Sequence, residues 1–261
     1  MKKRTLFLSS LIGIILFACG GGGGGGGGNS DTGTNIIYST DYTNRDLTKV
    51  YTFKETAVDT TDGKNTPSEN TITYSYEQNI ATIPSKYGYS GTITGPYTVE
   101  TIEPAGTNKT LTYFSFSNII ISDDSTIFTS IDHSDSTGVI PPDWTVGIVY
   151  PKSSTEDLFN STSGLKVGTK ATEYTLKALG KENVAVPAGT FEAVKTKETS
   201  TITITFISGL TETITTTWFI WYSENKSAVK KVSTTTDSLT DGSLTETLTY
   251  TATDELTNVS P

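Results

Sequence analysis

The chain has 261 residues, of which 34% are hydrophobic, and its formal net charge at pH 7 is −9. This acidic balance excludes an electrostatic surface for nucleic acid or for anionic lipid headgroups. A single cysteine excludes any disulfide within the chain, so the hydrophobic core must stabilise the fold by itself.

The first eighteen residues have the organisation of a secretory signal peptide. Lys2, Lys3 and Arg4 give a positive start, and residues 5–18 are uncharged and mostly apolar. This stretch is shorter than the ~20 residues that a membrane-spanning helix needs. A charged start and an apolar run of ~7–15 residues are typical of a cleaved signal. The alternative is an ordinary signal, or an uncleaved anchor, with an incidental cysteine.

The tetrad Leu16-Phe17-Ala18-Cys19 at the end of this run resembles the lipobox of bacterial lipoproteins. The resemblance implies that a diacylglycerol is attached to the Cys19 sulfur, that the signal is cut before Cys19, and that the new amine is acylated. Gly20 resembles the residue that lets such lipoproteins pass to the outer membrane. We therefore expect the membrane to be a partner through this N-terminal lipid, on either the periplasmic or the surface side.

Nine glycines follow the cysteine, and residues 20–35 contain only Gly, Asn, Ser, Asp and Thr. Such a tether is a flexible coil with a root-mean-square span of about 22 Å, and it reaches about 55 Å when fully extended. A phosphate-binding glycine loop would open a helix after a strand, and neither element is predicted here. We assign 1–18 to the signal, 19–40 to the lipidated cysteine and tether, and 41–261 to a β-rich extracytoplasmic domain.

The rest of the chain is predicted to be β-structure, because threonine makes up about a fifth of it and β-branched residues favour strands. Ser154–Phe159 is a candidate for a single turn of helix. Strands are expected at Lys49–Val58, Thr71–Glu77, Tyr97–Glu103, Thr110–Ile121 and Thr145–Tyr150.

From about Leu165 to Thr253 the sequence predicts four or five consecutive hairpin-linked strands. Apolar and threonine side chains alternate strictly in segments such as Ser200–Phe206. Asp241-Gly242 has the residues of a tight hairpin turn, and Asp62-Gly63 is a candidate for a longer one. We expect an all-β monomer with one large, curved antiparallel sheet, half-barrel or sandwich-like, and almost no helix outside the signal peptide. The polar stretch Asp132–Asp143 is a possible internal boundary.

Two segments, VAVPAGTFEAVK (184–195) and WFIWYSENKSAVKKV (218–232), resemble a pattern in uncharacterised Gram-negative envelope proteins. Those proteins are similar in outline to half-barrel lipoprotein carriers, which curve an antiparallel sheet around an apolar groove. Within the first segment, Pro187 cannot donate to a ladder and ends a strand, and Gly189 permits the turn. The resemblance implies a fold and leaves the activity open.

The strand around Trp218 is predicted to be apolar on both faces. Trp218, Ile220 and Tyr222 share one face, whereas Phe219 and Trp221 lie on the other. Either other parts of the chain cover Phe219 and Trp221, or these residues line an apolar groove that binds a ligand. We expect cover. The Thr-x-Thr rows are similar to those of ice- or sugar-binding sheets, but sheet twist breaks the flat repeat, so we expect a solvent face.

No catalytic residues are predicted. His133 is the sole histidine, and although Asp132 and Ser134 flank it, sequence neighbours do not form a triad; we expect it in a solvated loop. Carboxylate pairs such as Asp123-Asp124 and Glu156-Asp157 are expected on an acidic surface. No metal site and no cofactor are expected, because His and Cys ligands are too few. The predicted function is a non-catalytic binding or structural lipoprotein with a hydrophobic ligand or an envelope protein as possible partner. The alternatives are an acyl-chain or lipoprotein carrier and, more remotely, a surface hydrolase.

Overall fold

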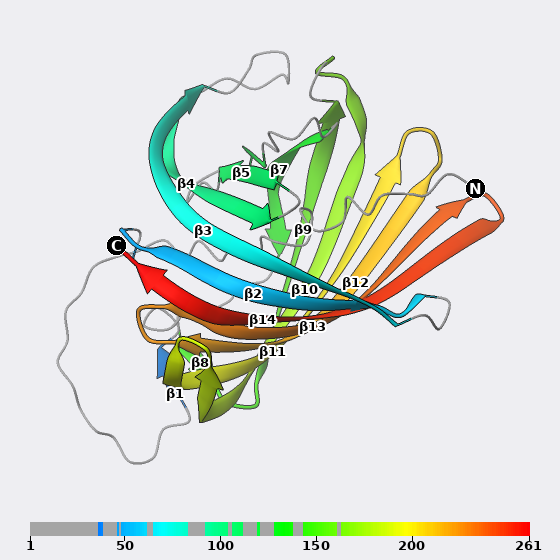
Figure 1. Ribbon diagram of the computed structural model, residues 1–261. Helices are drawn as coiled ribbons and strands as arrows, with labels where there is room; N and C mark the ends of the chain where they lie inside the picture. The colour runs from blue at the N-terminus through cyan, green and yellow to red at the C-terminus, as the bar shows by residue number, and fades with distance from the viewer. Residues whose placement is uncertain are drawn as a thin grey trace.

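The computed structural model describes residues 36–38, 46, 48–61, 65–82, 92–103, 106–111, 119–120, 128–137, 143–160 and 163–261. These residues form fourteen strands, and none of them lies in an α-helix (Figure 1). The first eight strands are β1 (Ile36–Tyr38), β2 (Val50–Asp59), β3 (Thr66–Thr82), β4 (Thr92–Glu103), β5 (Gly106–Leu111), β6 (Ile119–Ile120), β7 (Phe128–Thr137) and β8 (Asp143–Thr145). The other six are β9 (Val149–Asn160), β10 (Lys166–Val186), β11 (Gly189–Phe206), β12 (Thr211–Ser223), β13 (Ser227–Asp241) and β14 (Leu244–Ser260).

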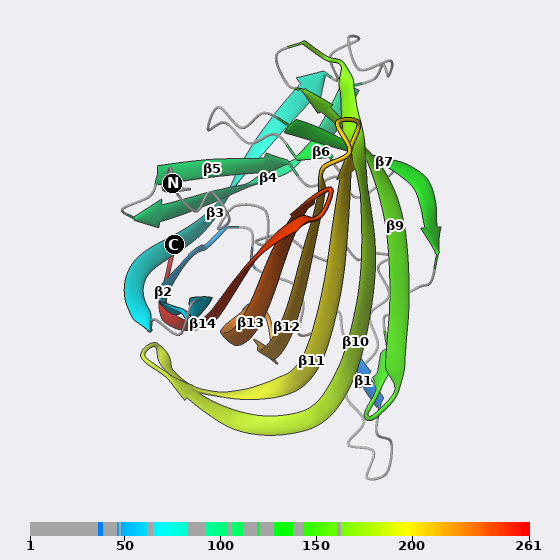
Figure 2. The same ribbon diagram turned by 90° about the vertical axis from the view of Figure 1, so that its right-hand side faces the viewer.

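Twelve strands form one antiparallel sheet in the order β5-β4-β3-β2-β14-β13-β12-β11-β10-β9-β7-β6, and β1 pairs with β8 in a separate two-stranded sheet. The large sheet bends strongly along its width, as Figures 1 and 2 show from two sides, and its hydrogen-bond order ends at β5 and β6. The all-β class and the large, curved, hairpin-linked antiparallel sheet are therefore confirmed. Strands β10 to β14 are five consecutive strands, where the C-terminal sequence predicted four or five.

Alternation along β11 divides the large sheet into two chemically different faces. Positions 194, 196, 198, 200, 202 and 204 are all buried, and we call this side, with the residues paired to it, the Glu198 face. The odd positions from 195 to 205 are half-buried or exposed and are mainly threonine; we call this side the Trp221 face. One rung of the Trp221 face joins Thr205, Thr211, Thr240 and Thr245 across four strands. These threonines lie at the surface, where β-branched residues favour the strand without a packing partner.

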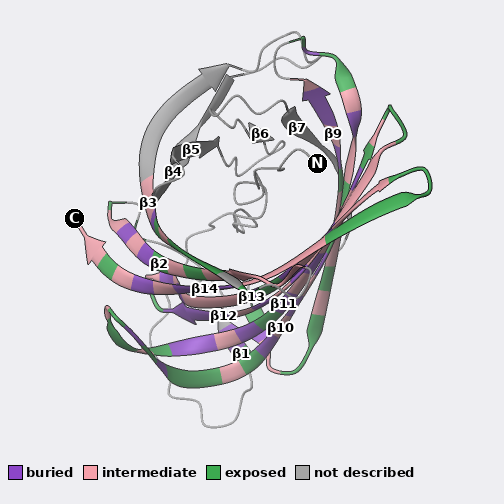
Figure 3. Ribbon diagram, turned by 45° about the vertical axis from the view of Figure 1, so that its right-hand side comes forward, coloured by how far each residue is buried: buried purple, intermediate pink, exposed green. Residues whose placement is uncertain are grey.

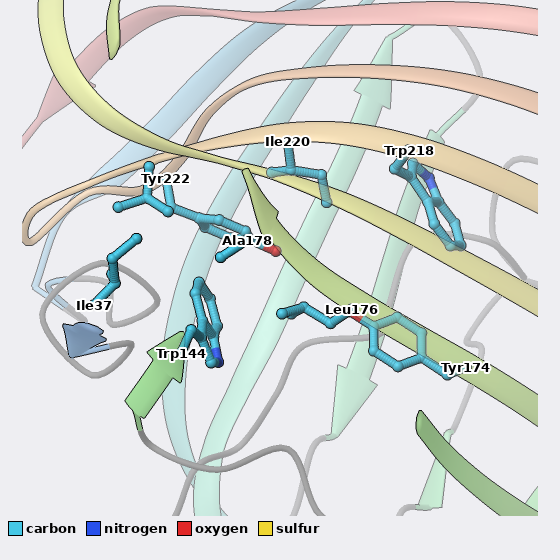
Figure 4. Packing of buried hydrophobic residues seen from close by; sticks show 9 residues of the cluster. Ile37, Trp144, Tyr174, Leu176, Ala178, Trp218, Ile220 and Tyr222 are labelled. Carbon is cyan, nitrogen blue, oxygen red and sulfur yellow. The ribbon is translucent and has the colours of Figure 1, made fainter. Parts of the chain in front are cut away.

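Two hydrophobic clusters hold the sheet. The first lies where the β1–β8 pair packs on the Glu198 face (Figure 4). Its buried members are Ile37, Trp144, Tyr174, Leu176, Ala178, Val194, Trp218, Ile220 and Tyr222. The second joins the start of β2 to the ends of β10 and β14. Its buried members are Tyr51, Phe53, Ile72, Val184, Val186, Ala193, Trp221, Val229 and Leu256. Trp218, Ile220 and Tyr222 therefore belong to a core cluster, as the alternation predicts.

Several local expectations are wrong or shifted. Ser154–Phe159 is not a helical turn but part of β9, where its backbone pairs with both β7 and β10. The expected strand Thr145–Tyr150 is interrupted after Thr145 by a turn that contains Gly147 at a φ of +88°. Tertiary pairing decides both cases, because β9 lies between two strands of the sheet and must be extended to satisfy both.

The hairpin turns lie close to the expected positions. Asp241 pairs with Leu244, so the turn residues are Gly242 and Ser243, one position later than predicted, and Gly242 has a φ of +58°. Val186 pairs with Gly189, which places Pro187 and Ala188 in the turn between β10 and β11. Asp62-Gly63 lies outside the described residues, and the strand expected at Thr110–Ile121 is described only at its two ends, in β5 and β6.

The possible boundary at Asp132–Asp143 is described in part: residues 132–137 belong to β7, and the division into subdomains stays a prediction. No helix in the described ranges is long and apolar enough to cross a membrane.

Candidate functional site

The predicted lipid-attachment residue, Cys19, lies outside the described residues, as do the signal and the tether. Lipidation therefore stays a prediction that rests on the sequence. The folded part offers two regions for a site: the Phe219 and Trp221 side of β12, and a buried carboxyl group on the Glu198 face.

Trp221 is 9% exposed, and Phe219 is partly buried beside it on the Trp221 face. The Nζ atom of Lys195 lies 4.8 Å from the centre of the Trp221 ring and 5.7 Å from that of Phe219. Lys230 approaches the same indole at 6.0 Å. A cation within about 6 Å of an aromatic face is attracted by the ring quadrupole. The two lysines therefore place charge next to the aromatic surface that the sequence suggests for a groove.

The polar edge of Trp221 is also bonded within the chain. Its Nε1–H donates to Oε1 of Glu182 at 2.6 Å, and Lys195 Nζ lies 3.4 Å from the same oxygen. The hydrogen bond from Trp221, and then the charge of Lys195, hold the pKa of the Glu182 carboxyl below its ordinary value. Trp221 is thus fixed by β10 and β11 and by its own strand.

Cover for the second cluster comes from the far end of the β10–β11 hairpin. A register shift between Ala178 and Gly180, where Gly180 has a φ of +134°, breaks the regular ladder of β10. Beyond it, Val184 and Val186 pack into the cluster that contains Trp221. The turn is fastened as well, because the Ala188 N–H donates to the Leu256 carbonyl at 3.0 Å. Entry of an acyl chain at this place would require the hairpin end and Lys195 to move, and such binding stays a prediction.

On the other face of the sheet, the Glu198 carboxyl accepts hydrogen bonds from three side chains. Glu198 is 3% exposed. Its Oε2 accepts a hydrogen bond from the Tyr174 hydroxyl at 2.6 Å, and its Oε1 accepts from Thr196 at 2.7 Å and from Tyr222 at 3.0 Å. Burial raises the pKa of the carboxyl above its ordinary value, and the hydrogen bonds and the charge of Lys231 partly oppose this. Burial beside Glu198 also raises the pKa of Tyr174 well above the usual range.

Sequence reasoning missed Glu198, although a signal was present. Glu198 has the same parity as Ile202 and Ile204, so the alternation that buries these isoleucines also buries the carboxyl. What the alternation does not contain is the identity of its partners, because Tyr174 and Tyr222 each lie 24 residues away in the sequence.

The other side chains that the sequence analysis considered for catalysis or metal binding either take part in strand pairing and ion pairs or lie outside the described residues. His133 lies in β7, paired with Thr155, rather than in the loop expected for it. Glu156 bonds Lys170 at 3.1 Å and Asp157 bonds Lys166 at 2.6 Å. Because Glu156 and Asp157 are consecutive residues of one strand, their side chains point to opposite faces of the sheet. Asp123 and Asp124 are outside the described residues. In the part of the chain that the structure describes, no three His, Cys, Asp or Glu side chains are grouped to hold a metal ion.

Comparison with known proteins gives two similar solved structures. One is a putative lipoprotein from Parabacteroides distasonis, 14% identical, with a TM-score of 0.36 over 81% of this chain and 94% of that one. The other is a putative exported protein with a YmcC-like fold from Bacteroides fragilis, 14% identical, with a TM-score of 0.34 over 84% of this chain and 98% of that one. No family model and no curated protein matches the chain. Likeness at this level establishes neither a shared fold nor a shared function.

Proposed function

We propose that the chain is a lipid-anchored protein of the bacterial cell envelope, held at the outer membrane through acyl chains on Cys19, with a non-catalytic binding or structural role. The observation that carries this proposal is the position of the sole cysteine. It stands at the end of a signal-like apolar run, and nine glycines follow it. A lipidated cysteine needs a flexible tether before a folded domain can begin clear of the headgroups, and more than one acyl chain makes the attachment stable.

The bonding of Glu198 supports a structural role for the buried polar groups. Both oxygens of this carboxyl accept hydrogen bonds from side chains of the same domain, and the group is shielded from water. Buried polar networks whose members are satisfied stiffen a fold and specify its packing. This arrangement fixes β10, β11 and β12 to one another.

A carrier of acyl chains or lipoproteins is the second candidate. It is favoured by the aromatic side chains of Phe219 and Trp221, which extend the apolar surface of β12 to its second face. It is opposed by the two lysines next to the Trp221 ring. Substitution of Trp221, described in the Discussion, separates the two candidates.

The anchor is tested by Cys19→Ala in the full chain. We expect the variant to incorporate no radioactive palmitate and to be found as uncleaved precursor or as released protein, because the acceptor sulfur is missing. The wild-type chain should be labelled and should fractionate with the outer membrane. Gly22→Ala, a change in the same tether that leaves the sulfur in place, is the matched control and should be labelled normally. Palmitate incorporation into the Cys19→Ala protein would overturn the proposal.

A further inference from the structure

The most exposed large apolar side chains of the described residues lie on the tips of three hairpins. They are Leu165, Ile207 and Leu244, which are 68%, 73% and 66% exposed. Leu165 precedes β10, Ile207 follows β11, and Leu244 begins β14. Figure 3 shows that the ends of the β11–β12 and β13–β14 hairpins project from the sheet and are coloured mainly as exposed. None of the three side chains contributes to the core of its own domain.

The three tips lie at the same end of the large sheet. Along the order β9-β10-β11-β12-β13-β14, the turns that join β9 to β10, β11 to β12 and β13 to β14 fall on one side, because successive strands are antiparallel. The pairs Thr205–Thr211 and Thr240–Thr245 share a rung just inside the second and third tips. Neighbouring tips are two strands apart, which corresponds to about 10 Å at the base of the hairpins.

Similar short sequences are found at the three tips. The first two tips share the sequence Ser-Gly-Leu, at 163–165 and at 208–210. The third tip, at 242–244, has the sequence Gly-Ser-Leu, in which the first two residues are in reverse order. Each glycine has a positive φ, at +69°, +91° and +58°, so the small residues make the turns. Turns favour small and polar residues, whereas each of these turns has an exposed leucine or isoleucine beside it.

We propose that these tips insert into the interface of the bilayer to which the Cys19 lipid is attached. This inference rests on the proposed lipid anchor. Residues 163–165, 207–210 and 242–244 carry no charged side chain, so these turn residues can leave water without desolvating a charge of their own. Lys166 and Asp241 lie directly beside the first and third of these segments and would remain at the headgroups. The apolar side chains project separately from three turns rather than forming one flat patch. This arrangement fits a fluid interface, where the strength of attachment follows the apolar area that enters it.

The tether is long enough for this orientation. The Gly147 N–H donates to the Ala178 carbonyl at 2.9 Å, which places the turn between β8 and β9, and with it the β1–β8 pair, at Ala178 on β10. From Ala178 to Lys166 the strand spans about 40 Å at 3.3 Å per residue. The sixteen residues before Ile36 reach about 55 Å when extended. The lipid and the three tips can therefore occupy the same surface.

A second group of exposed apolar residues offers the competing orientation. Ile148, which is 50% exposed, and Val149 lie in and after the turn between β8 and β9, and Leu179 lies at the irregularity of β10. These residues are close to Ile36, where the tether ends. If they faced the bilayer, the hairpin tips would point away from it. Position 148 therefore serves as the internal control.

The test uses the full lipidated chain in vesicles of zwitterionic phospholipid. The natural cysteine is blocked by its lipid, so a cysteine introduced by Leu165→Cys, Ile207→Cys or Leu244→Cys is a unique site for an environment-sensitive fluorophore. Quencher groups placed on the acyl chains of the vesicle lipids report insertion. Ile148→Cys and Thr190→Cys are the controls; Thr190 is exposed on the β10–β11 hairpin, at the opposite end of the sheet.

We expect a blue-shifted, lipid-quenched signal from the three tip positions and neither effect from positions 148 and 190. Quenching at 148 alone, or at no position, would overturn the proposal. A blue shift at the tips without lipid quenching would do the same, and would indicate contact with a second copy of the chain. Protein that fails to float with the vesicles would instead show that the lipid anchor is wrong, so the two failures are distinguishable.

A second measurement removes the apolar groups themselves. With the fluorophore at position 165, Ile207→Ser combined with Leu244→Ser should lower the ratio of inserted to free tips by about tenfold or more, because attachment follows the apolar area buried. Thermal unfolding should be unchanged, since both side chains are exposed in the folded domain. Ile148→Ser, which also removes an exposed apolar group, should leave the ratio unchanged. An unchanged ratio in the double variant would contradict insertion.

Discussion

Glu198 shows how a single residue can be buried by the pattern of its strand and then held by distant parts of the chain. Alternation along β11 directs its side chain to the interior, where an unpaired carboxylate would be very costly. Three hydroxyl groups from β10, β11 and β12 surround the carboxyl, and each donates to it. The residue therefore joins three neighbouring strands through their side chains in addition to their backbone ladders.

The raised pKa of Glu198 predicts a particular pH dependence of stability. The folded protein retains this proton at pH values where the unfolded chain, with the ordinary pKa of 4.5, has lost it. The stability contributed by the group is therefore fully present below pH 4.5 and is lost as the pH rises through the folded-state pKa. We expect Glu198→Gln, which cannot ionise, to remove this loss. Urea unfolding of both proteins from pH 4.5 to neutral pH measures it.

Glu182→Gln provides the control of opposite sign. The pKa of Glu182 is lowered by the Trp221 hydrogen bond, so its contribution is present above the ordinary pKa and is lost as the pH falls. The stability of wild type relative to Glu182→Gln should thus rise with pH, whereas that relative to Glu198→Gln should fall. Parallel stability curves for wild type and Glu198→Gln would contradict the role assigned to this carboxyl.

At the level of single elements, the end of the β10–β11 hairpin covers one of the two apolar faces of β12. β12 is apolar on both faces, and one sheet face can be covered by the β1–β8 pair. The other face needs a different cover, which the far end of the hairpin supplies through Val184 and Val186. The ladder irregularity at Gly180 separates this end of β10 from the part that faces β9. An irregularity of this kind bends a strand and increases its twist.

Trp221→Ala tests whether this side of β12 is a core or a groove. Because Trp221 is buried and hydrogen-bonded within the domain, we expect the substitution to lower the free energy of unfolding by about 3–5 kcal/mol, the usual range for large buried aromatics. Trp218→Ala, on the opposite face of the same strand, should cost a similar amount. Thermal unfolding and binding of a fluorescent fatty acid are measured on both variants. A stable Trp221→Ala protein that has lost fatty-acid binding seen in the wild type would favour the carrier instead.

The whole molecule combines a glycine-rich N-terminal sequence with a long β-sheet, and the proposed orientation requires the reach of the first to match the length of the second. The β1–β8 pair lies about 40 Å along β10 from the hairpin tips, by the rise of a strand. The tether can cover this distance only because it is long. Its glycines have no apolar side chain to bury, so we expect them to contribute to reach rather than to stability.

Deletion of Gly20–Gly28 should separate these two properties. Seven tether residues, 29–35, would remain before Ile36, with a reach of about 25 Å. We expect the melting temperature of the folded domain to be unchanged and lipid quenching at the tip positions to be lost. Replacing the nine glycines with serines keeps the length and should preserve both. A large fall in the melting temperature after deletion would show that the segment contributes to the fold.

Local patterns in the sequence determined most of the secondary structure. Period-two alternation and β-branched composition specified β10 to β14 and assigned Trp218 and Trp221 to opposite faces. Glycine and proline marked the hairpin turns to within one residue. The local signal misled at Ser154–Phe159, where helix-tolerant residues lie between two strands that require an extended partner.

The tertiary structure decided which residues contact each face of a strand. Tyr174 and Tyr222 reach Glu198 because β10 and β12 are its neighbours in the sheet, and Ala188 reaches Leu256 although 68 residues separate them. Alternation records which way a side chain points, since this depends on the backbone of one strand. The partner on that side depends on strand order, curvature and the ladder irregularity in β10. Curvature, the ladder irregularity and the pairing of β14 with β2 arise from contacts between distant segments, which the alternation within one strand does not specify.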